Sequence, residues 1–257
     1  LASRGTAFLN AHTAAPVCCP SRAAVMSGLR PSTSGIYNNQ HWWKPNRPNL
    51  VTLPEHFRNN GYIAAGAGKI FHHTAGNNPP AVWDEYHRLV FNDDAFSRSA
   101  GRYLTLYPFT KSQPVPKEFP YCGIKLYSPE VDWGVLPKPE NMMDDFQTVR
   151  NCTNFLERKH TKPFFLACGI FHPHLPWYVP KKYLDQYPTD QIRLPAAPPD
   201  DLNDIPKAGQ KIALRKNQDL KKVQDAKKWK TAVAHYLASI TYADARIGQL
   251  LKGLDQS

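Results

Sequence analysis

A helix–turn–strand unit occurs twice in the sequence and restricts the chain to folds in which helices alternate with buried strands. In the first copy, the run LPEHFRNN at residues 53–60 has the pattern of a short helix, and Gly61 ends it as a C-terminal cap. The run YIAAGAG at 62–68 then predicts a small buried strand that leads into Lys69. A buried strand therefore delivers a charged side chain at its carboxyl end.

The second copy is longer and keeps the same order. A helix is expected over 144–160, with an apolar stripe formed by Phe146, Val149, Thr153 and Leu156. The apolar run FFLACGIF at 164–171 then predicts a strand that ends in His172-Pro173-His174. In open α/β sheets, ligands bind at the carboxyl ends of the strands. We therefore expect the polar residues that follow both strands to contribute to one site.

The rest of the chain combines one long helix with long irregular segments. Apolar residues at spacings of three and four predict a helix over about 227–254. Residues 74–141 and 178–210 are rich in Pro, Asp, Asn and aromatic residues, and we interpret them as ordered loops that wall a cleft. The 257 residues, 42% of them hydrophobic, suffice for one or two globular domains. No apolar run approaches the roughly 18 to 20 residues of a membrane span, so none is expected.

The formal net charge of +11 is concentrated in one segment. Residues 206–230 hold nine Lys and Arg against two Asp, a balance of 9 − 2 = +7. Such a segment can bind an anionic polymer or simply form a solvated face. Nucleic acid is disfavoured, because the basic residues are not interleaved with stacking aromatic residues. The five cysteines have neither the number of a disulfide scaffold nor the spacing of a zinc site, and they leave the redox compartment open.

The strongest candidate for chemistry is the segment CCPSRAAVMSG at residues 18–28. Pro20 suits the first turn of a helix and Gly28 suits its C-terminal cap, so Cys18 is expected at or just before a helix N-terminus. Unpaired backbone amides and the helix dipole at that position favour an anion, and Arg22 adds a positive fork suited to an oxyanion. Taken alone, these features fit a buried structural cysteine equally well.

The string Cys18-x-Pro20-Ser21-Arg22, followed by a hydrophobic pair and Gly28, resembles the signature of the type I sulfatases, in the alkaline phosphatase superfamily. The resemblance covers nearly the whole chain and is closest to the iduronate-2-sulfatase-like branch. Its further matches are Gly35-Ile36-Tyr37, Thr52-Leu53-Pro54, Asn60-Gly61-Tyr62, Gly68-Lys69, Pro163-Phe164-Phe165-Leu166 and the string SITYADARIGQLL at 239–251. It implies a three-layer α/β/α sandwich around a mixed, largely parallel sheet, with residues 1–257 forming one sulfatase catalytic domain.

The resemblance also implies a nucleophile. In this family the signature cysteine, here Cys18, is converted after synthesis to formylglycine by dedicated machinery that reads the positions of Pro20 and Arg22. The hydrated aldehyde would attack sulfur with one hydroxyl, and the other hydroxyl would later lose its proton so that sulfate leaves.

Two further clusters resemble the sulfate-binding elements of the family. Gly68-Lys69-Ile70-Phe71-His72 supplies Lys69 and His72, and His172-Pro173-His174 supplies His174 as the preferred sulfate contact. His172 is also counted among the substrate-binding residues, but it and His73 are second choices, and their alternative role is to orient the others. Lys69 would offer a cation to a sulfuryl oxygen. His72 and His174 would donate hydrogen bonds, and one of them, left unassigned, would act as general acid.

The family binds a divalent cation, usually Ca²⁺, through formylglycine and through acidic pairs on the first strand and on a strand after the long helix. Neither acidic pair has a counterpart here, because Asp93-Asp94, Asp144-Asp145 and Asp200-Asp201 stand in loop or helix-start contexts. Apart from Cys18 as formylglycine, the metal ligands are expected outside this chain. We interpret it as an internal fragment, incomplete at both ends and inactive alone.

The leading hypothesis is a sulfuric ester hydrolase that acts on an anionic substrate, a sulfated small molecule or glycan. A phosphonate or phosphodiester hydrolase of the same superfamily can share the Cys-x-Pro-Ser-Arg string. A non-catalytic polyanion-binding protein would account for the basic segment at 206–230 and for the missing metal ligands. By resemblance, the compartment would be extracellular, periplasmic or lysosomal.

Overall fold

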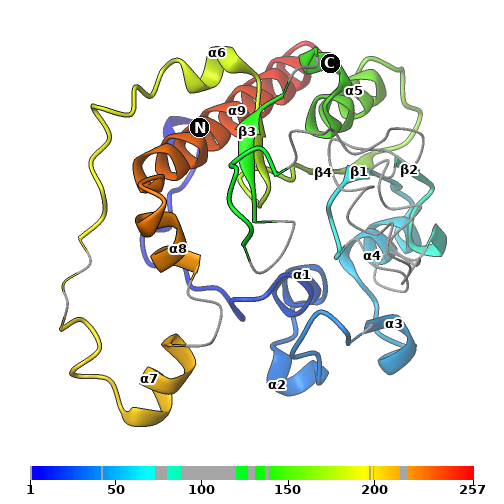
Figure 1. Cartoon of the computed structure of the whole chain (residues 1–257). Helices are drawn as coiled ribbons and strands as arrows, with labels where there is room; N and C mark the ends of the chain where they lie inside the picture. The colour runs from blue at the N-terminus through cyan, green and yellow to red at the C-terminus, as the bar shows by residue number, and fades with distance from the viewer. Residues whose placement is uncertain are drawn as a thin grey trace. The chain divides into compact units, whose positions relative to one another are not determined.

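The structure, a computed structural model, describes residues 2–41, 43–72, 80–87, 120–126, 131–136, 139–196, 198, 200–214 and 219–257. The chain divides into two compact units. The first comprises residues 1–96 and 158–169, and the second comprises 97–157 and 170–257. Each unit has its own parallel strands, which Figure 1 labels. Each unit also has its own buried hydrophobic cluster.

The first unit is built on a three-stranded parallel sheet of order β2-β1-β4. Its elements are α1 (Cys18–Ser27), α2 (Pro31–Ser34), α3 (Trp43–Asn46), α4 (Leu53–Asn59), β1 (Ile63–Gly68), β2 (Glu85–His87) and β4 (Phe164–Gly169), with 3-10 turns at Ala2–Arg4 and Pro80–Val82. Strands β1 and β4 are paired from Ile63 with Phe164 to Gly68 with Gly169. The two strands predicted from the repeated unit therefore lie side by side and end at the same level.

Helix α4 leads into the central strand β1, as predicted. At its start, the Thr52 N–H donates to Glu55 Oε2 at 2.9 Å, which satisfies one backbone donor of the helix entry. At its end, Gly61 has a φ of 87°, a conformation that favours glycine. The helix packs against β1 and β4, with the Phe57 ring stacked on that of Phe165 at 4.7 Å.

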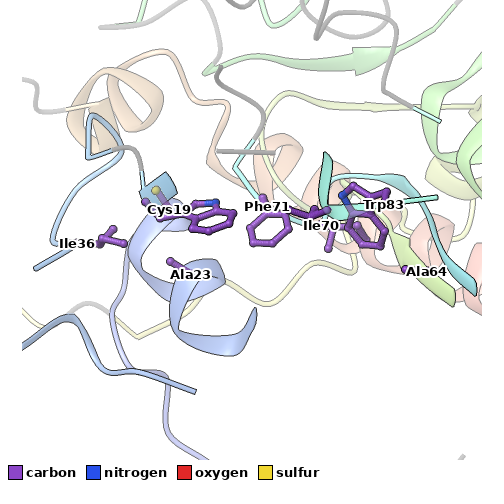
Figure 2. Packing of buried hydrophobic residues seen from close by; sticks show 9 residues of the cluster. Cys19, Ala23, Ile36, Ala64, Ile70, Phe71 and Trp83 are labelled. Carbon is purple, nitrogen blue, oxygen red and sulfur yellow. The ribbon is translucent and has the colours of Figure 1, made fainter. Parts of the chain in front are cut away.

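The core of the first unit joins α1 to the residues that follow β1. Figure 2 shows Phe71 and Ile70 between Cys19 of α1 and Trp83. The Phe71 ring centroid lies 5.3 Å from that of Trp43 and 6.4 Å from that of Trp83. The buried members of the cluster are Cys19, Ala23, Ile36, Trp43, Ala64, Ile70, Phe71, Val82 and Trp83. This packing holds the chain after β1 against helix α1.

Two glycines allow the ends of β1 and β4 to meet closely. Gly68, the last residue of β1, has a φ of 79°. Opposite it, Gly169 accepts a hydrogen bond of 2.8 Å from the Lys69 N–H through its carbonyl. A Cβ atom on Gly169 would lie within 2.6 Å of three backbone atoms of Lys69. A side chain at position 169 therefore fits only if the backbone at Lys69 moves.

The second unit consists of helices around a pair of parallel strands. Its elements are β3 (Trp133–Val135), α5 (Asp144–Leu156), β5 (Trp177–Val179), α6 (Lys181–Leu184), α7 (Lys207–Ala213), α8 (Asp219–Asp225) and α9 (Trp229–Asp255), with a 3-10 turn at Glu140–Met142. The long helix α9 confirms the prediction for 227–254. It contacts α5, α6, α8 and both strands, and Figure 1 shows α5 beside it.

Helix α5 differs from its prediction in length and in buried face. It ends at Leu156 rather than at residue 160, and Phe146 and Thr153, assigned to the apolar stripe, are only half-buried. The buried face consists of Asp144, Asp145, Thr148, Val149, Cys152, Phe155 and Leu156. The difference arises because two carboxylates, Asp144 and Asp145, lie on the buried face of the helix. The spacing of apolar residues alone cannot identify a buried face that contains charged side chains.

Most of the predicted loop 74–141 lies outside the described residues, as do Asp93 and Asp94. The predicted loop 178–210 contains the end of β5, α6 and the start of α7, separated by irregular chain. Within the parts of the chain that the structure covers, no helix has both the length and the apolarity to cross a membrane.

The close approach at Gly169 predicts that Gly169→Ala lowers the free energy of unfolding by about 1–3 kcal/mol, because the backbone of Lys69 has to move to make room. Gly248 of α9 is the matched control, since its Cβ would have no heavy atom within 4 Å. Gly248→Ala is expected to raise stability by about 0.5–1 kcal/mol, the usual gain in a helix interior. Urea unfolding of both variants checks this, and equal midpoints would contradict the tight contact.

Candidate active site

The start of α1 gives its two adjacent cysteines different environments. Cys19 is 2% exposed, its N–H donates to Asn39 Oδ1 at 2.9 Å, and its thiol donates to His41 O at 3.3 Å. Burial, together with the neighbouring Cys18, raises the pKa of the Cys19 thiol to about 11. Cys18 is half-buried. Of these two adjacent cysteines, Cys19 therefore belongs to the core and Cys18 is the more exposed to solvent.

The first turn of α1 has fewer available amides than the sequence predicts. The N–H of Cys19 is already bonded to a side chain, Pro20 has no N–H, and the Ser21 N–H donates to Val17 O at 3.0 Å. The expected cradle of unpaired amides at this helix start is therefore not formed by these residues. Of the backbone features expected to favour an anion there, the helix dipole remains.

Arg22 joins α1 to the chain after β1. Its Nη1 donates to the carbonyl oxygens of Lys69 at 2.5 Å and of Ile70 at 3.0 Å. Burial lowers the pKa of the Arg22 guanidinium, and the nearby Cys18 and Tyr86 act in the opposite direction. Within the described chain, Arg22 Nε and Nη2 have no hydrogen-bond partner. Two donor atoms of the guanidinium therefore stay available in the described chain.

Lys69 and His72 follow β1 and are both buried, at 2% and 6% exposure. A lysine is rarely buried to this degree unless its ammonium group is paired. An interior of low dielectric strengthens the attraction between such a group and an anion. The first unit thus brings the segment with Lys69 and His72 against the helix that carries Cys18 and Arg22. His73 lies outside the described residues.

His172 lies in the second unit, in the segment after β4, and its side chain is fully buried. Its Nδ1 is 2.6 Å from Asp145 Oδ2, and its Nε2 is 3.0 Å from Tyr178 O. Because both ring nitrogens are engaged, neither is available to a sulfate oxygen. This geometry favours the orienting role of His172 over direct contact with substrate.

His174 lies two residues further on and is half-buried. Its backbone N–H donates to Phe171 O at 3.1 Å, and its Nδ1 is 2.6 Å from Leu175 O. A carbonyl can only accept, so Nδ1 donates this hydrogen bond. The contact therefore fixes the orientation of the His174 ring.

Sequence reasoning misses two buried aspartates that hold this part of the chain. Asp132 is fully buried and accepts hydrogen bonds of 2.5–2.9 Å from the backbone N–H groups of Tyr121, Cys122 and Trp133 and from the Tyr178 hydroxyl. Burial and the charge of Asp132 raise the pKa of Tyr178. Asp145 accepts from the N–H groups of Phe171 and His172. Most of these partners are distant in sequence, so no local pattern reveals them.

The described residues do not form the cation site that the resemblance implies. They contain no group of three or more His, Cys, Asp or Glu side chains placed to hold a metal ion. Asp145, which is more deeply buried than Asp144, Asp200 and Asp201, is engaged by His172. A calcium ion takes six to eight oxygen ligands, and Cys18 as formylglycine would supply only one position.

The different environments of the two cysteines predict selective alkylation. In folded protein whose Cys18 is unmodified, iodoacetamide at pH 8 should label Cys18 well ahead of Cys19, because Cys19 is buried and its thiol has a pKa of about 11. Peptide mass spectrometry measures the labelled fraction of each residue, and urea-denatured protein, in which both react, is the control. Equal labelling in the folded protein would contradict the assignment.

The buried carboxylate of Asp144 predicts a pH-dependent stability. Burial, with a smaller effect of Asp145, raises the pKa of Asp144 from 3.8 to about 7. Between these values the folded state holds a proton that the unfolded state has lost, so this group lowers stability by up to about 1.4 kcal/mol per pH unit as pH rises, and no further above pH 7.

Asp144→Asn removes this effect. Its free energy of unfolding relative to the natural chain should therefore rise between pH 5 and pH 7 and stay constant from pH 7.5 to pH 8.5. Urea unfolding at these pH values measures the difference, and a difference that does not change with pH would show that Asp144 is ionised throughout.

Comparison with known proteins identifies the family of the chain. The family model described as Sulfatase matches residues 1–257. The whole chain is 35% identical to a sulfatase of Formosa agariphila, covering 50% of it, and 99% of the chain is 30% identical to human iduronate 2-sulfatase, covering 46% of it. The chain thus spans about half the length of the curated relatives it matches.

Two solved structures share its fold. A phosphonate monoester hydrolase of Agrobacterium radiobacter aligns with a TM-score of 0.65 and 14% identity over 95% of this chain and 51% of its own. A sulfatase-like protein of Bacteroides thetaiotaomicron aligns with a TM-score of 0.58 and 19% identity over 100% of this chain and 48% of its own. The predicted α/β fold of the alkaline phosphatase type, with parallel strands, is confirmed. The chain belongs to the sulfatase family.

Proposed function

We propose that the protein to which this chain belongs hydrolyses sulfuric esters, with Cys18 as the precursor of its nucleophile. The observation that carries the proposal is the link between α1 and the chain after β1. Arg22 of the Cys-x-Pro-Ser-Arg string donates to the carbonyl oxygens of Lys69 and Ile70, so two segments about fifty residues apart in sequence meet in one unit.

Position 18 would act as formylglycine. Its aldehyde hydrate would supply one hydroxyl that attacks sulfur and displaces the alcohol, and a second hydroxyl whose deprotonation lets sulfate leave and restores the aldehyde. The half-buried position of Cys18 at the first residue of α1 supports this role, since a nucleophile has to reach both substrate and water.

Arg22 and Lys69 would stabilise the negative charge that develops on the sulfuryl oxygens. Arg22 is fixed through Nη1, which leaves Nε and Nη2 as charge-assisted donors. The buried Lys69 adds a cation that needs no reorganisation during the reaction. His72 and His174 would donate to bridging or leaving oxygens, and His174 offers Nε2 as the proton donor because its Nδ1 is engaged by a carbonyl.

The proposed substrate is an anionic sulfated carbohydrate. The net charge of +11 favours an anionic partner, and one relative is named as a sulfatase of a sugar acid, iduronate. The basic segment at 206–230 gives less support to a purely polyanion-binding protein. Two of its lysines form ion pairs along α8, Lys221 with Asp225 and Lys222 with Asp219, as expected of a solvated face.

In the full-length protein, Cys18→Ala should abolish hydrolysis of 4-nitrophenyl sulfate, while Lys69→Ala and His174→Ala should each lower kcat about 10²-fold or more, as the loss of a charge-stabilising donor does. Circular dichroism confirms the fold of each variant. Near-natural rates for all three would end the proposal. Faster turnover of bis(4-nitrophenyl) phosphate than of the aryl sulfate would identify a phosphodiesterase instead.

A further inference from the structure

We propose that Asp145 is a positioning residue for His174, acting through the backbone of Phe171 and the ring of His172. This inference rests on the proposed function in one respect, the contact of His174 with the sulfate group. Its structural basis lies entirely within the second unit.

Asp145 makes three hydrogen-bond contacts with the chain directly after β4. Its Oδ1 accepts from the Phe171 N–H at 2.6 Å, and its Oδ2 accepts from the His172 N–H at 3.0 Å and lies 2.6 Å from His172 Nδ1. The side chains of Asp145 and His172 are both 0% exposed. A buried carboxylate is costly unless its oxygens are fully hydrogen-bonded, and here these three contacts meet that requirement.

The ring of His172 connects Asp145 to Tyr178 of β5. Its Nε2 lies 3.0 Å from Tyr178 O, and the Tyr178 hydroxyl donates to Asp132 Oδ2 at 2.5 Å. A carbonyl can only accept, so His172 Nε2 donates the hydrogen bond to Tyr178 O. The segment from Phe171 to Tyr178 is therefore fastened at both ends by buried aspartates.

His174 lies between these ends and is connected to Asp145 by a short path. The Phe171 N–H is held by Asp145, while the Phe171 carbonyl accepts from the His174 N–H at 3.1 Å. The Phe171 ring also packs on the His174 ring, with centroids 4.7 Å apart. Any shift of Phe171 thus moves both the backbone and the ring of His174. Displacing a catalytic group by about 1 Å can cost about 10²-fold in rate.

The preceding residue provides a matched control. Asp144 is also a buried aspartate of α5, at 9% exposure, but the structure gives it no hydrogen bond to the segment after β4. Asp144→Asn and Asp145→Asn therefore make the same chemical change at neighbouring buried positions. Only Asp145→Asn weakens the hydrogen bonds to Phe171 and His172.

The test is a double-mutant cycle in the full-length protein, with 4-nitrophenyl sulfate as substrate and inorganic sulfate as the binding probe. Asp145→Asn should lower kcat by about 10- to 100-fold and weaken sulfate binding in calorimetry, whereas Asp144→Asn should stay within about twofold of the natural enzyme. In a His174→Ala background, Asp145→Asn should cause no further loss beyond about twofold. The lack of a further loss of rate in the His174→Ala background distinguishes positioning of His174 from general destabilisation, because destabilisation would lower the rate in both backgrounds.

If Asp145→Asn fails to fold, His172→Gln takes its place. It leaves both backbone N–H bonds to Asp145 and removes only the ring contacts, so its loss should be smaller and should again vanish without His174. The inference is overturned if either variant costs the same factor with and without His174, or if Asp145→Asn keeps the natural rate while His174→Ala is slow. A natural rate for His174→Ala in an enzyme that Cys18→Ala inactivates would instead refute the role of His174 in the proposed function, and this inference with it.

Discussion

The candidate site depends on the hydrogen bonds from Arg22 Nη1 to the carbonyl oxygens of Lys69 and Ile70. They fasten the helix that begins at Cys18 to the carboxyl end of the central strand. The same short stretch is held from its other side, where the Lys69 N–H donates to Gly169 O at the end of β4. Helix, central strand and neighbouring strand therefore meet at the backbone of one lysine, and the glycine at position 169 is what permits the approach.

The second unit uses buried carboxylates for the same purpose. Asp132 and Asp145 each accept several hydrogen bonds from main-chain N–H groups, which offsets the cost of burying their charge. Such bonds fix irregular chain that has neither helix nor sheet to satisfy its amides. The histidine segment after β4 is of this kind, and its geometry is set by side chains rather than by secondary structure.

Much of the fold follows from the sequence, because helix α4 and strand β1 have Gly or Pro at their boundaries and helix α9 has apolar residues at spacings of three and four. The site follows in part. Lys69 and His174 are found as polar residues at strand ends, and Cys18 at a helix start. The inward carboxylate of Asp145 is not found, since its partners Phe171 and His172 lie 26 and 27 residues away. The engagement of His172 Nε2 is not found either, since its partner is a backbone carbonyl, Tyr178 O. The sequence also does not show that Cys19 is buried while Cys18 is half-buried, because this depends on which face of α1 packs against the core.

The chemical state of residue 18 tests the account most directly. Trypsin cleaves after Arg4 and Arg22, so mass spectrometry of peptide 5–22 from the full-length protein, purified from its natural host, reads that state. The formylglycine mechanism predicts a mass in which the –CH₂SH group of Cys18 is replaced by –CHO, a label from an aldehyde-specific hydrazide at that residue, and a specific activity that rises with the aldehyde fraction. A fully active preparation that retains an intact thiol at position 18 would contradict it.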